Sequence, residues 1–211
     1  MSDQKKRVNK RLLQGERSRG EILDAAARVM SEHGFGATSI ADIARESGLP
    51  NSSIYWHFNS KAGILAAVME RGAERFFAST ENPPPEPTMS PAIYLRRVLR
   101  EASESFTEHP QFLRLFVFLL LSNNSPEIVE IVHRVRAHGR DNLRTLIASA
   151  FRTTAPDHAD LISDQTVDFA LAAFDGAFLA LQAAPAVSHE HLMDQLADAL
   201  ASLGQQILDA V

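Results

Sequence analysis

The chain has 211 residues, no cysteine and a formal net charge of −5, and 45% of its residues are apolar. This composition suits one or two globular domains and excludes disulfide and thiol chemistry. The opening residues are charged, and the apolar run from Phe112 to Leu121 contains Arg114 and is too short to span a bilayer. We therefore expect a cytoplasmic protein.

Charge is distributed unevenly along the chain. Residues 1–61 contain ten Lys or Arg and seven Asp or Glu, a net of +3, which leaves −8 for residues 62–211. A basic N-terminal part favours an anionic partner, although a basic tail also serves as a solubilising arm. We expect residues 1–16 to be a flexible basic tail, and Lys5 to Arg19 either to extend a nucleic-acid contact or to form a disordered arm.

The apolar periodicity is helical nearly throughout, and no alternating pattern typical of a strand is found. Apolar residues recur at steps of three and four from Ser18 to Gly34, which predicts a helix that ends at this glycine in a left-handed conformation. Ser39 and Asp42 predict a capping box for a short second helix that stops at Gly48.

A third short helix is predicted to begin at Asn51, after a turn at Pro50, and to end near Phe58. Its Ile54 and Phe58 are four residues apart and share a face, which we expect to pack against Ile43, Leu49 and Leu65. Ser60 can cap a fourth, longer helix.

Proline and polar residues interrupt the rest of the chain. Residues 81–91 predict a linker, because prolines lack amide donors. Further breaks divide the remainder into five helices, and they fall at 109–110, 122–126, 153–157 and 183–186. The predicted fold is all-α, with about nine helices.

The outward-facing side chains of the third predicted helix suit DNA. A short helix after a tight turn, with polar and planar side chains outward, is what a helix-turn-helix recognition element requires. Amides and hydroxyls can bond bases or phosphates, aromatic and imidazole donors can reach phosphate oxygens, and a lysine adds a cation. Each residue alone could be core or solvated surface, but their order together favours DNA. The candidates are Asn51, Ser52, Ser53, Tyr55, Trp56, His57 and Lys61.

Two patterns, I-A-x-x-x-G-L at residues 43–49 and Y-x-H-F-x-x-K at residues 55–61, resemble the DNA-binding domain of the TetR family of bacterial transcriptional regulators. The resemblance covers residues 17–77. It implies an all-helical homodimer in which residues 78–211 bind an effector and dimerise. By position it adds Ser39 to the DNA-contacting residues, whereas Ala41 replaces a residue that is often polar in the family.

Residues 78–211 resemble nothing specific enough to name an effector. The family implies a pocket between the fourth and seventh helices, and aromatic residues with a few polar groups suit an apolar cavity, although a helical Phe alone is more often core. Arg114 could pair with an anionic ligand or lie at the surface. The candidate lining residues are Tyr94, Phe112, Arg114, Phe116, His133 and Phe151.

Apolar stripes at helical spacing mark the last two predicted helices. Two such helices from each of two copies could close a four-helix interface, as the resemblance implies, or both stripes could pack within one subunit. The candidate interface residues are Val167, Leu171, Phe174, Phe178, Leu192, Leu196, Leu200 and Leu203.

Enzymatic and metal-binding functions find little support in the sequence. His133 and His138 are five apart and do not share a helix face, and no phosphate-binding loop or nucleophile elbow is present. We expect no cofactor, no metal and no catalysis. The sequence predicts a DNA-binding regulator, by default a repressor released by a small molecule. The alternatives are a helical interaction protein that has lost DNA binding and a helical-bundle enzyme.

Overall fold

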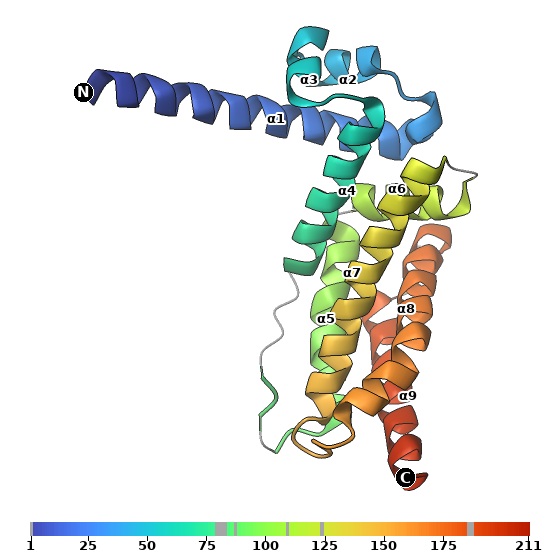
Figure 1. Ribbon diagram of the computed structural model, residues 1–211. Helices are drawn as coiled ribbons and strands as arrows, with labels where there is room; N and C mark the ends of the chain where they lie inside the picture. The colour runs from blue at the N-terminus through green and yellow to red at the C-terminus, as the bar shows by residue number, and fades with distance from the viewer. Residues whose placement is uncertain (1, 79–83, 87, 109, 123–124, 185–187) are drawn as a thin grey trace. The chain divides into compact units, whose positions relative to one another are not determined.

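The computed structural model describes residues 2–78, 84–86, 88–108, 110–122, 125–184 and 188–211, with only the backbone described for residues 2–12, Ala78 and Ser105. Over these residues the chain is all-α and forms nine helices (Figure 1), as predicted. The helices are α1 (Ser2–Ala37), α2 (Ile40–Ser47), α3 (Asn51–His57), α4 (Lys61–Ala78), α5 (Pro91–Glu108), α6 (Pro110–Leu121), α7 (Pro126–Phe151), α8 (Ala159–Ala183) and α9 (His189–Asp209).

Two segments were expected to lack regular structure, a tail at residues 1–16 and a linker at residues 81–91. The segment expected to be a flexible tail, residues 1–16, is helical from Ser2 and continues into the body of α1. Most of the linker expected at residues 81–91 lies outside the described residues.

The chain divides into two compact units, which are described separately. Unit 1 comprises Met1–Gly72 and Gln111–His133, and unit 2 comprises Ala73–Pro110 and Arg134–Val211. This division differs from the boundary expected at residues 77–78, because most of α6 belongs to unit 1. The Phe112 ring packs on Gly72 of α4, and the Phe118 ring packs on Gly34 of α1.

Unit 1 has a core of apolar side chains from its N-terminal helices, and α1 contributes several of them. Ile22, Leu23 and Met30 of α1 are each at most 1% exposed. Gly34 has φ 80° and ψ 157°, so the expected left-handed helix end is instead a kink, after which the helix resumes to Ala37. A side chain at Gly34 would both strain this backbone and collide with the Phe118 ring, since a Cβ would lie 2.7 Å from it.

Local capping chemistry sets the ends of α2 and the start of α4, as predicted. The Ser39 hydroxyl accepts a hydrogen bond from the Asp42 amide at 3.1 Å, and the Asp42 carboxylate accepts one from the Ser39 amide at 2.9 Å. These Ser39 bonds, the side-chain one first, and then Arg45 lower the pKa of Asp42 to about 2. Gly48 ends α2 at φ 69°, and Ser60 accepts from the Gly63 amide at 3.0 Å.

Unit 2 has an aromatic cluster in its core and ion pairs along its surface. The Phe106 ring lies 4.8 Å from Phe174 and 5.7 Å from Phe178. Arg140 and Arg144 of α7 pair with Asp168 and Asp164 of α8 at 2.8 and 2.5 Å, while Arg96 and Arg100 of α5 pair with Asp198 and Asp194 of α9. Exposed pairs of this kind contribute little stability each, so the burial of apolar surface dominates.

Helix α8 is long and apolar enough to cross a membrane by length and composition. Ten of its residues are buried inside unit 2, from Ala159 to Phe178. A core helix of a helical domain passes the same test of length and composition.

Candidate nucleic-acid interface

Helix α3 presents one buried side and one exposed side. Ile54 is 0% and Phe58, just past its end, 7% exposed, so the predicted buried face is confirmed. On the other side Tyr55 is 59% and Trp56 is 76% exposed. The polar residues at its N-terminal end, Asn51 and Ser52, are also exposed, while Ser53 and His57 are half-buried. The helix therefore offers amide, hydroxyl, phenol and indole groups to a partner from one surface.

Ser39, in the turn before α2, is a further candidate for a DNA contact in unit 1. Ser39 is exposed, but its hydroxyl is engaged at 2.6 Å with the Asp42 carboxylate in the capping box. Ala41, on α2, is exposed and offers only a methyl group. Ser39 thus has a structural role, in addition to any contact that it makes with a partner.

His57 is tied to α1, which the sequence analysis did not anticipate. Its Nε2 lies 2.8 Å from the Ser18 hydroxyl, and that hydroxyl donates to the Gly15 carbonyl oxygen at 3.0 Å. The Ser18 oxygen therefore accepts the hydrogen bond from the imidazole N–H. Burial, and then the nearby Arg19 cation, lower the pKa of His57, which favours the neutral ring.

Lys61 also bonds to α1. Its ammonium group donates to the carbonyl oxygens of Phe35 and Thr38 at 2.9 and 2.8 Å, and more weakly to that of Gly36 at 3.4 Å. The same group lies 4.5 Å from the centre of the Phe35 ring. All three N–H donors of the ammonium are engaged, so Lys61 satisfies the carbonyls that the end of α1 leaves without helical partners. A phosphate oxygen could bond Lys61 only by displacing one of these carbonyl oxygens.

The six candidate ligand-lining residues fall into both units. Phe112 and Phe116 are buried and stacked at 6.2 Å in unit 1, where Arg114 and His133 are exposed. The other two are in unit 2: Tyr94 is fully buried on α5, and Phe151 packs on Gly204. Burial raises the pKa of Tyr94. None of the six lines either of the two grooves described for unit 2.

The candidate interface residues on α8 are buried within unit 2. Val167 is 0% and Phe178 is 2% exposed, and Leu171 and Phe174 are also buried, so these four side chains form the inner side of the helix. On α9, Leu196 and Leu200 are buried, while Leu192 and Leu203 are partly exposed. The four candidates on α8 therefore lie on the side of the helix that packs within unit 2. Another side of α8 lines a groove of about 310 Å³ together with α9, through Phe169, Ala173, Gly176, Ala177, Ala180, Leu192, Gln195, Leu196 and Ala199.

The sequence of unit 1 matches a known family. Residues 22–68, which include α2, α3 and the start of α4, match the profile of the family described as "Bacterial regulatory proteins, tetR family". Residues 22–68 of the chain therefore form a DNA-binding domain of the TetR type. The predicted resemblance to the TetR family and the predicted all-α fold are therefore confirmed.

Individual TetR-family proteins resemble the chain over different spans. The transcriptional regulator TtgR of Pseudomonas putida is 28% identical over 120 residues, which are 57% of this chain and 51% of TtgR. The chain thus spans about half the length of the curated relatives it matches.

Two solved structures share the fold over most of the chain. FadR from Bacillus subtilis, in complex with stearoyl-CoA, has a TM-score of 0.68 at 16% identity and covers 86% of this chain and 97% of its own. SmeT, described as the repressor of the Stenotrophomonas maltophilia multidrug efflux pump SmeDEF, has a TM-score of 0.64 at 20% identity over 87% of this chain and 88% of its own.

The contacts of Lys61 generate a prediction about stability. Replacing Lys61 by Met keeps the apolar stem and removes the ammonium, so the carbonyl oxygens at the end of α1 lose a charged donor. We expect the free energy of unfolding to fall by about 1–3 kcal/mol, measured by urea denaturation. The control Arg17→Met removes a cation from α1 whose side chain is 82% exposed, and it should change the free energy of unfolding by less than about 0.5 kcal/mol. Equal stability of the two variants would contradict the capping role.

Proposed function

We propose that the chain is a cytoplasmic transcriptional repressor that binds operator DNA as a homodimer and is released by a small-molecule effector. The observation that carries this proposal is the geometry of α3. Its apolar residues are buried in unit 1, and its polar and aromatic residues are exposed on a surface that can enter a major groove. The match of residues 22–68 to the TetR family supports the same function.

Within this proposal the eight candidate DNA-binding residues have two kinds of role. Asn51, Ser52 and Ser53 begin α3, and recognition helices contact base edges with their N-terminal residues. Tyr55 and Trp56 are exposed and offer O–H and N–H donors to phosphate oxygens. The remaining three residues, Ser39, His57 and Lys61, already bond within unit 1, so they act mainly by holding α2 and α3 in place.

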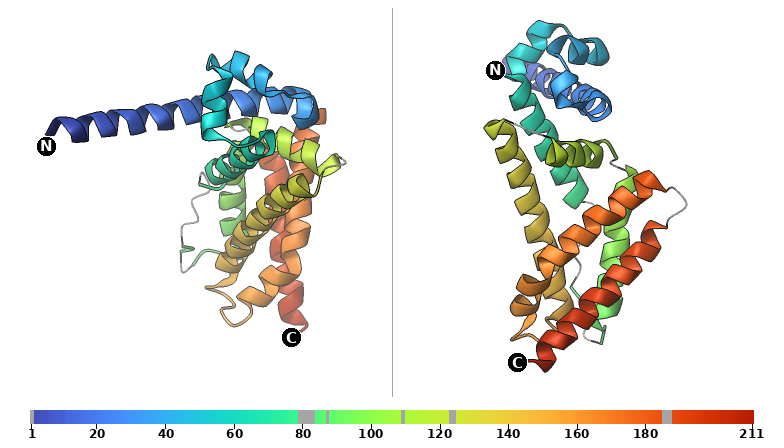
Figure 2. Two further views of the ribbon diagram at one scale, coloured as in Figure 1. Left: turned by 45° about the horizontal axis from the view of Figure 1, so that its top comes forward. Right: turned by 90° about the vertical axis from the view of Figure 1, so that its right-hand side faces the viewer.

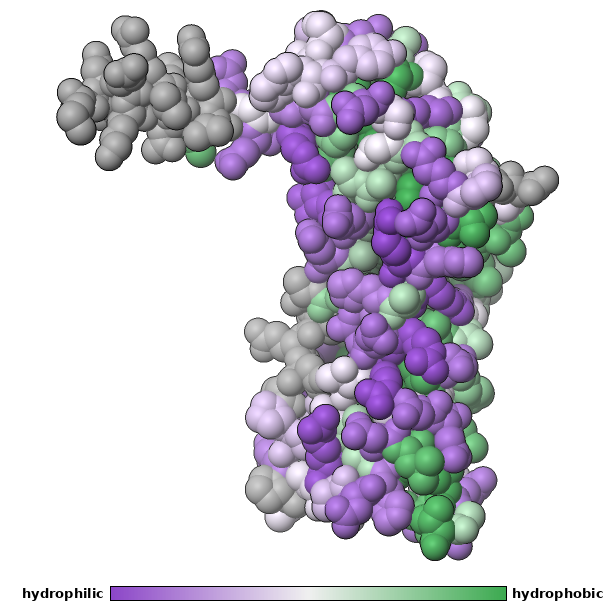
Figure 3. Space-filling view, in the orientation of Figure 1, coloured by the Kyte–Doolittle hydropathy of each residue, from purple (hydrophilic) through white to green (hydrophobic). Residues whose placement is uncertain are grey.

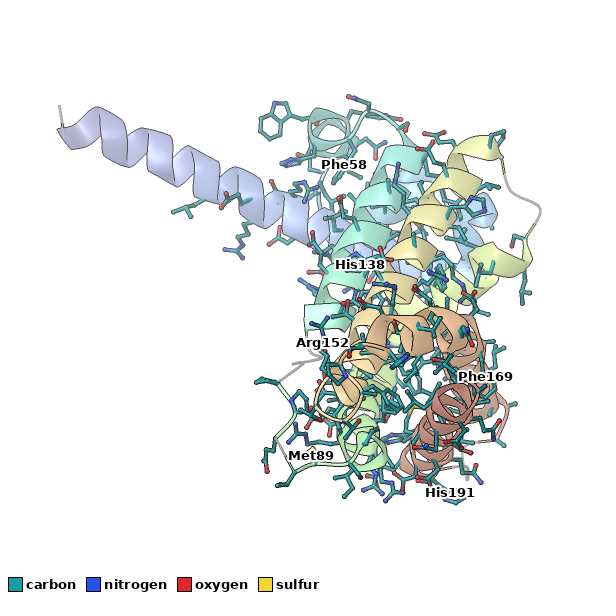
Figure 4. All side chains as sticks on the ribbon, turned by 60° about the horizontal axis from the view of Figure 1, so that its bottom comes forward. Phe58, Met89, His138, Arg152, Phe169 and His191 are labelled. Carbon is teal, nitrogen blue, oxygen red and sulfur yellow. The ribbon has the colours of Figure 1, made fainter. Side chains whose placement is uncertain are left out.

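A homodimer follows from the requirement for two recognition helices. Two copies of α3 must lie about 34–36 Å apart to enter successive major grooves on one side of a duplex. The groove between α8 and α9 offers an apolar surface for a second copy, and Phe169, labelled in Figure 4, is 47% exposed on it. Figure 3 shows apolar residues gathered along the edge of unit 2 where α8 and α9 lie, beside a largely polar face.

Release by an effector is supported by the relatives and by the chain itself. FadR was solved with stearoyl-CoA, and SmeT is described as a repressor. In this chain α4 and α7 each begin in unit 1 and end in unit 2, so each helix contributes residues to both units. Shifting DNA occupancy from 99:1 to 1:99 requires about 5.5 kcal/mol of differential affinity between the two states. The effector therefore has to bind the state that does not bind DNA far more tightly than the state that does.

The DNA-binding role of α3 is tested on the sites that the protein selects from genomic DNA. Replacing Asn51 by Ala should weaken binding by about 1–3 kcal/mol and relax the preference at one base position, because one amide no longer reads that base. The control Gln165→Ala removes an exposed amide from α8 and should leave affinity unchanged. A protein that protects no genomic site, or an Asn51→Ala variant with unaltered affinity and preference, would refute this role.

The proposed dimer surface predicts the effect of a single charge. Phe169→Glu places a carboxylate in the α8–α9 groove, where its desolvation in an interface is unfavourable, and should weaken dimerisation by roughly 30-fold or more. Leu161→Glu is the control, because Leu161 is 36% exposed on the same helix and does not line the groove. Sedimentation equilibrium measures both, with circular dichroism to confirm folding. A parent protein that stays monomeric, or a Phe169→Glu protein that dimerises like the parent, would contradict the proposed surface.

A further inference from the structure

The N-terminal end of α1 is a strongly basic helix on an otherwise acidic chain. Residues 2–14, called the arm here, contain five Lys or Arg (Lys5, Lys6, Arg7, Lys10 and Arg11) and one acidic residue, Asp3, a net charge of +4. Because the whole chain has a formal net charge of −5, the remaining residues sum to −9. The positive charge is thus concentrated in a single short segment, and its natural partner is a polyanion.

The arm is a helical extension that reaches away from the body of unit 1. Figures 1 and 2 show α1 continuing well past α2 and α3 before it ends at its N-terminus. At 1.5 Å per residue, the thirteen arm residues span about 20 Å. Leu13, at its inner end, is 61% exposed, which agrees with a helix that has left the core.

Three contacts fix the root of the arm to the recognition helix α3. The Ser18 hydroxyl bonds His57 at 2.8 Å, and the Arg19 guanidinium lies 5.4 Å from the centre of the Phe58 ring. The exposed Trp56 ring covers Gly15, where a Cβ would lie 3.8 Å from it, an ordinary van der Waals distance. All three contacts lie within unit 1 and join residues 15–19 to residues 56–58. The direction of the arm is therefore set relative to α3.

A duplex seated on α3 consequently lies next to the arm. Helix α1 passes the C-terminal end of α3, at Trp56 and His57, and its arm continues for about 20 Å beyond. Cationic residues on a helix beside a duplex gain affinity by displacing condensed counterions from phosphates. We infer that the arm binds the phosphate backbone of DNA next to the bases contacted by α3, and so lengthens the site that each subunit occupies.

The composition of the arm favours DNA over an acidic membrane surface. Helices that lie in a membrane interface need a broad apolar face as well as basic residues. The large apolar residues of the arm are only Val8, Leu12 and Leu13, against five cations. The inference rests on the proposed DNA-binding function, and it adds a contact outside the segment that matches the family profile, residues 22–68.

Directed cleavage of DNA can locate the arm, because the chain has no cysteine and one introduced thiol is a unique attachment point. An iron–EDTA group attached to a Gln4→Cys protein, bound to its own selected DNA site, should cut the backbone about six base pairs from the bases contacted by α3, given 3.4 Å per base pair. The matched control is Ser202→Cys, an exposed position on α9 in unit 2. Cleavage by the Gln4→Cys protein no stronger than that of the control would overturn the inference.

An arm without cations supplies an independent readout. Replacing the five arm cations by Gln keeps good helix formers in place. The variant should bind the selected site at least roughly tenfold more weakly in low salt, and the slope of log affinity against log salt should become shallower by about 0.9 for each phosphate that the arm no longer neutralises. Unchanged affinity and slope would overturn the inference while leaving the proposed function intact.

Two further outcomes distinguish DNA binding by the arm from a failure of the proposed function and from membrane binding. If the parent protein bound no duplex at all, the proposed function would fail and the arm inference with it. Vesicles containing phosphatidylserine test the other polyanionic partner. If the Gln variant lost binding to these vesicles but kept the parent affinity and salt slope for DNA, the arm would be a membrane contact and the inference would be wrong.

Discussion

The burial of Ile54 and Phe58 is the constraint on which the rest of the structure depends. A helix of seven residues has little stability of its own, so α3 exists because this apolar pair is buried in unit 1. Fixing that side also fixes the rotation of the helix. Tyr55 and Trp56, which lie between the two buried residues in sequence, are then obliged to face outward. The exposed chemistry of α3 is thus a direct consequence of its core packing.

Helix α1 is the second element that fixes the position of α3. It contacts the end of α3 through Ser18, and the backbone at its own C-terminal end contacts the start of α4. Ser18 bonds to His57, and the carbonyl oxygens of Phe35 and Thr38 bond to Lys61. These contacts turn two residues of the Y-x-H-F-x-x-K pattern inward, toward the scaffold. A helix-turn-helix surface needs rigid placement as much as it needs side chains that touch DNA, since small displacements of a recognition helix break contacts with base edges. His57 and Lys61 provide such placement.

Much of the fold and part of the site could be predicted because their causes are local in sequence. The capping box of Ser39 and Asp42, the end of α2 at Gly48 and the buried pair on α3 depend on residues close to one another along the chain. The contacts that could not be predicted join residues far apart. His57 meets Ser18 across 39 positions and Lys61 meets Phe35 across 26, and hydrophobic periodicity carries no information about such polar pairs.

The two sides of α8 show a different reason why part of the structure could not be predicted from the sequence. Phe174 and Phe169 are both apolar, yet Phe174 is 9% and Phe169 is 47% exposed. A helix that is apolar on several sides has no single stripe from which to choose its core face. The assignment of α6 to unit 1 was likewise beyond the sequence, because it depends on two glycines, Gly34 and Gly72, that leave room for the Phe118 and Phe112 rings.

The emission of Trp56 tests the central claim most directly, that the exposed side of α3 faces a duplex. It is the only tryptophan, and it is 76% exposed. Titration with the selected DNA site in low salt should change its emission and protect it from quenching by acrylamide, and added salt should reverse both effects. Unchanged emission and quenching at a DNA concentration that saturates binding would contradict the account.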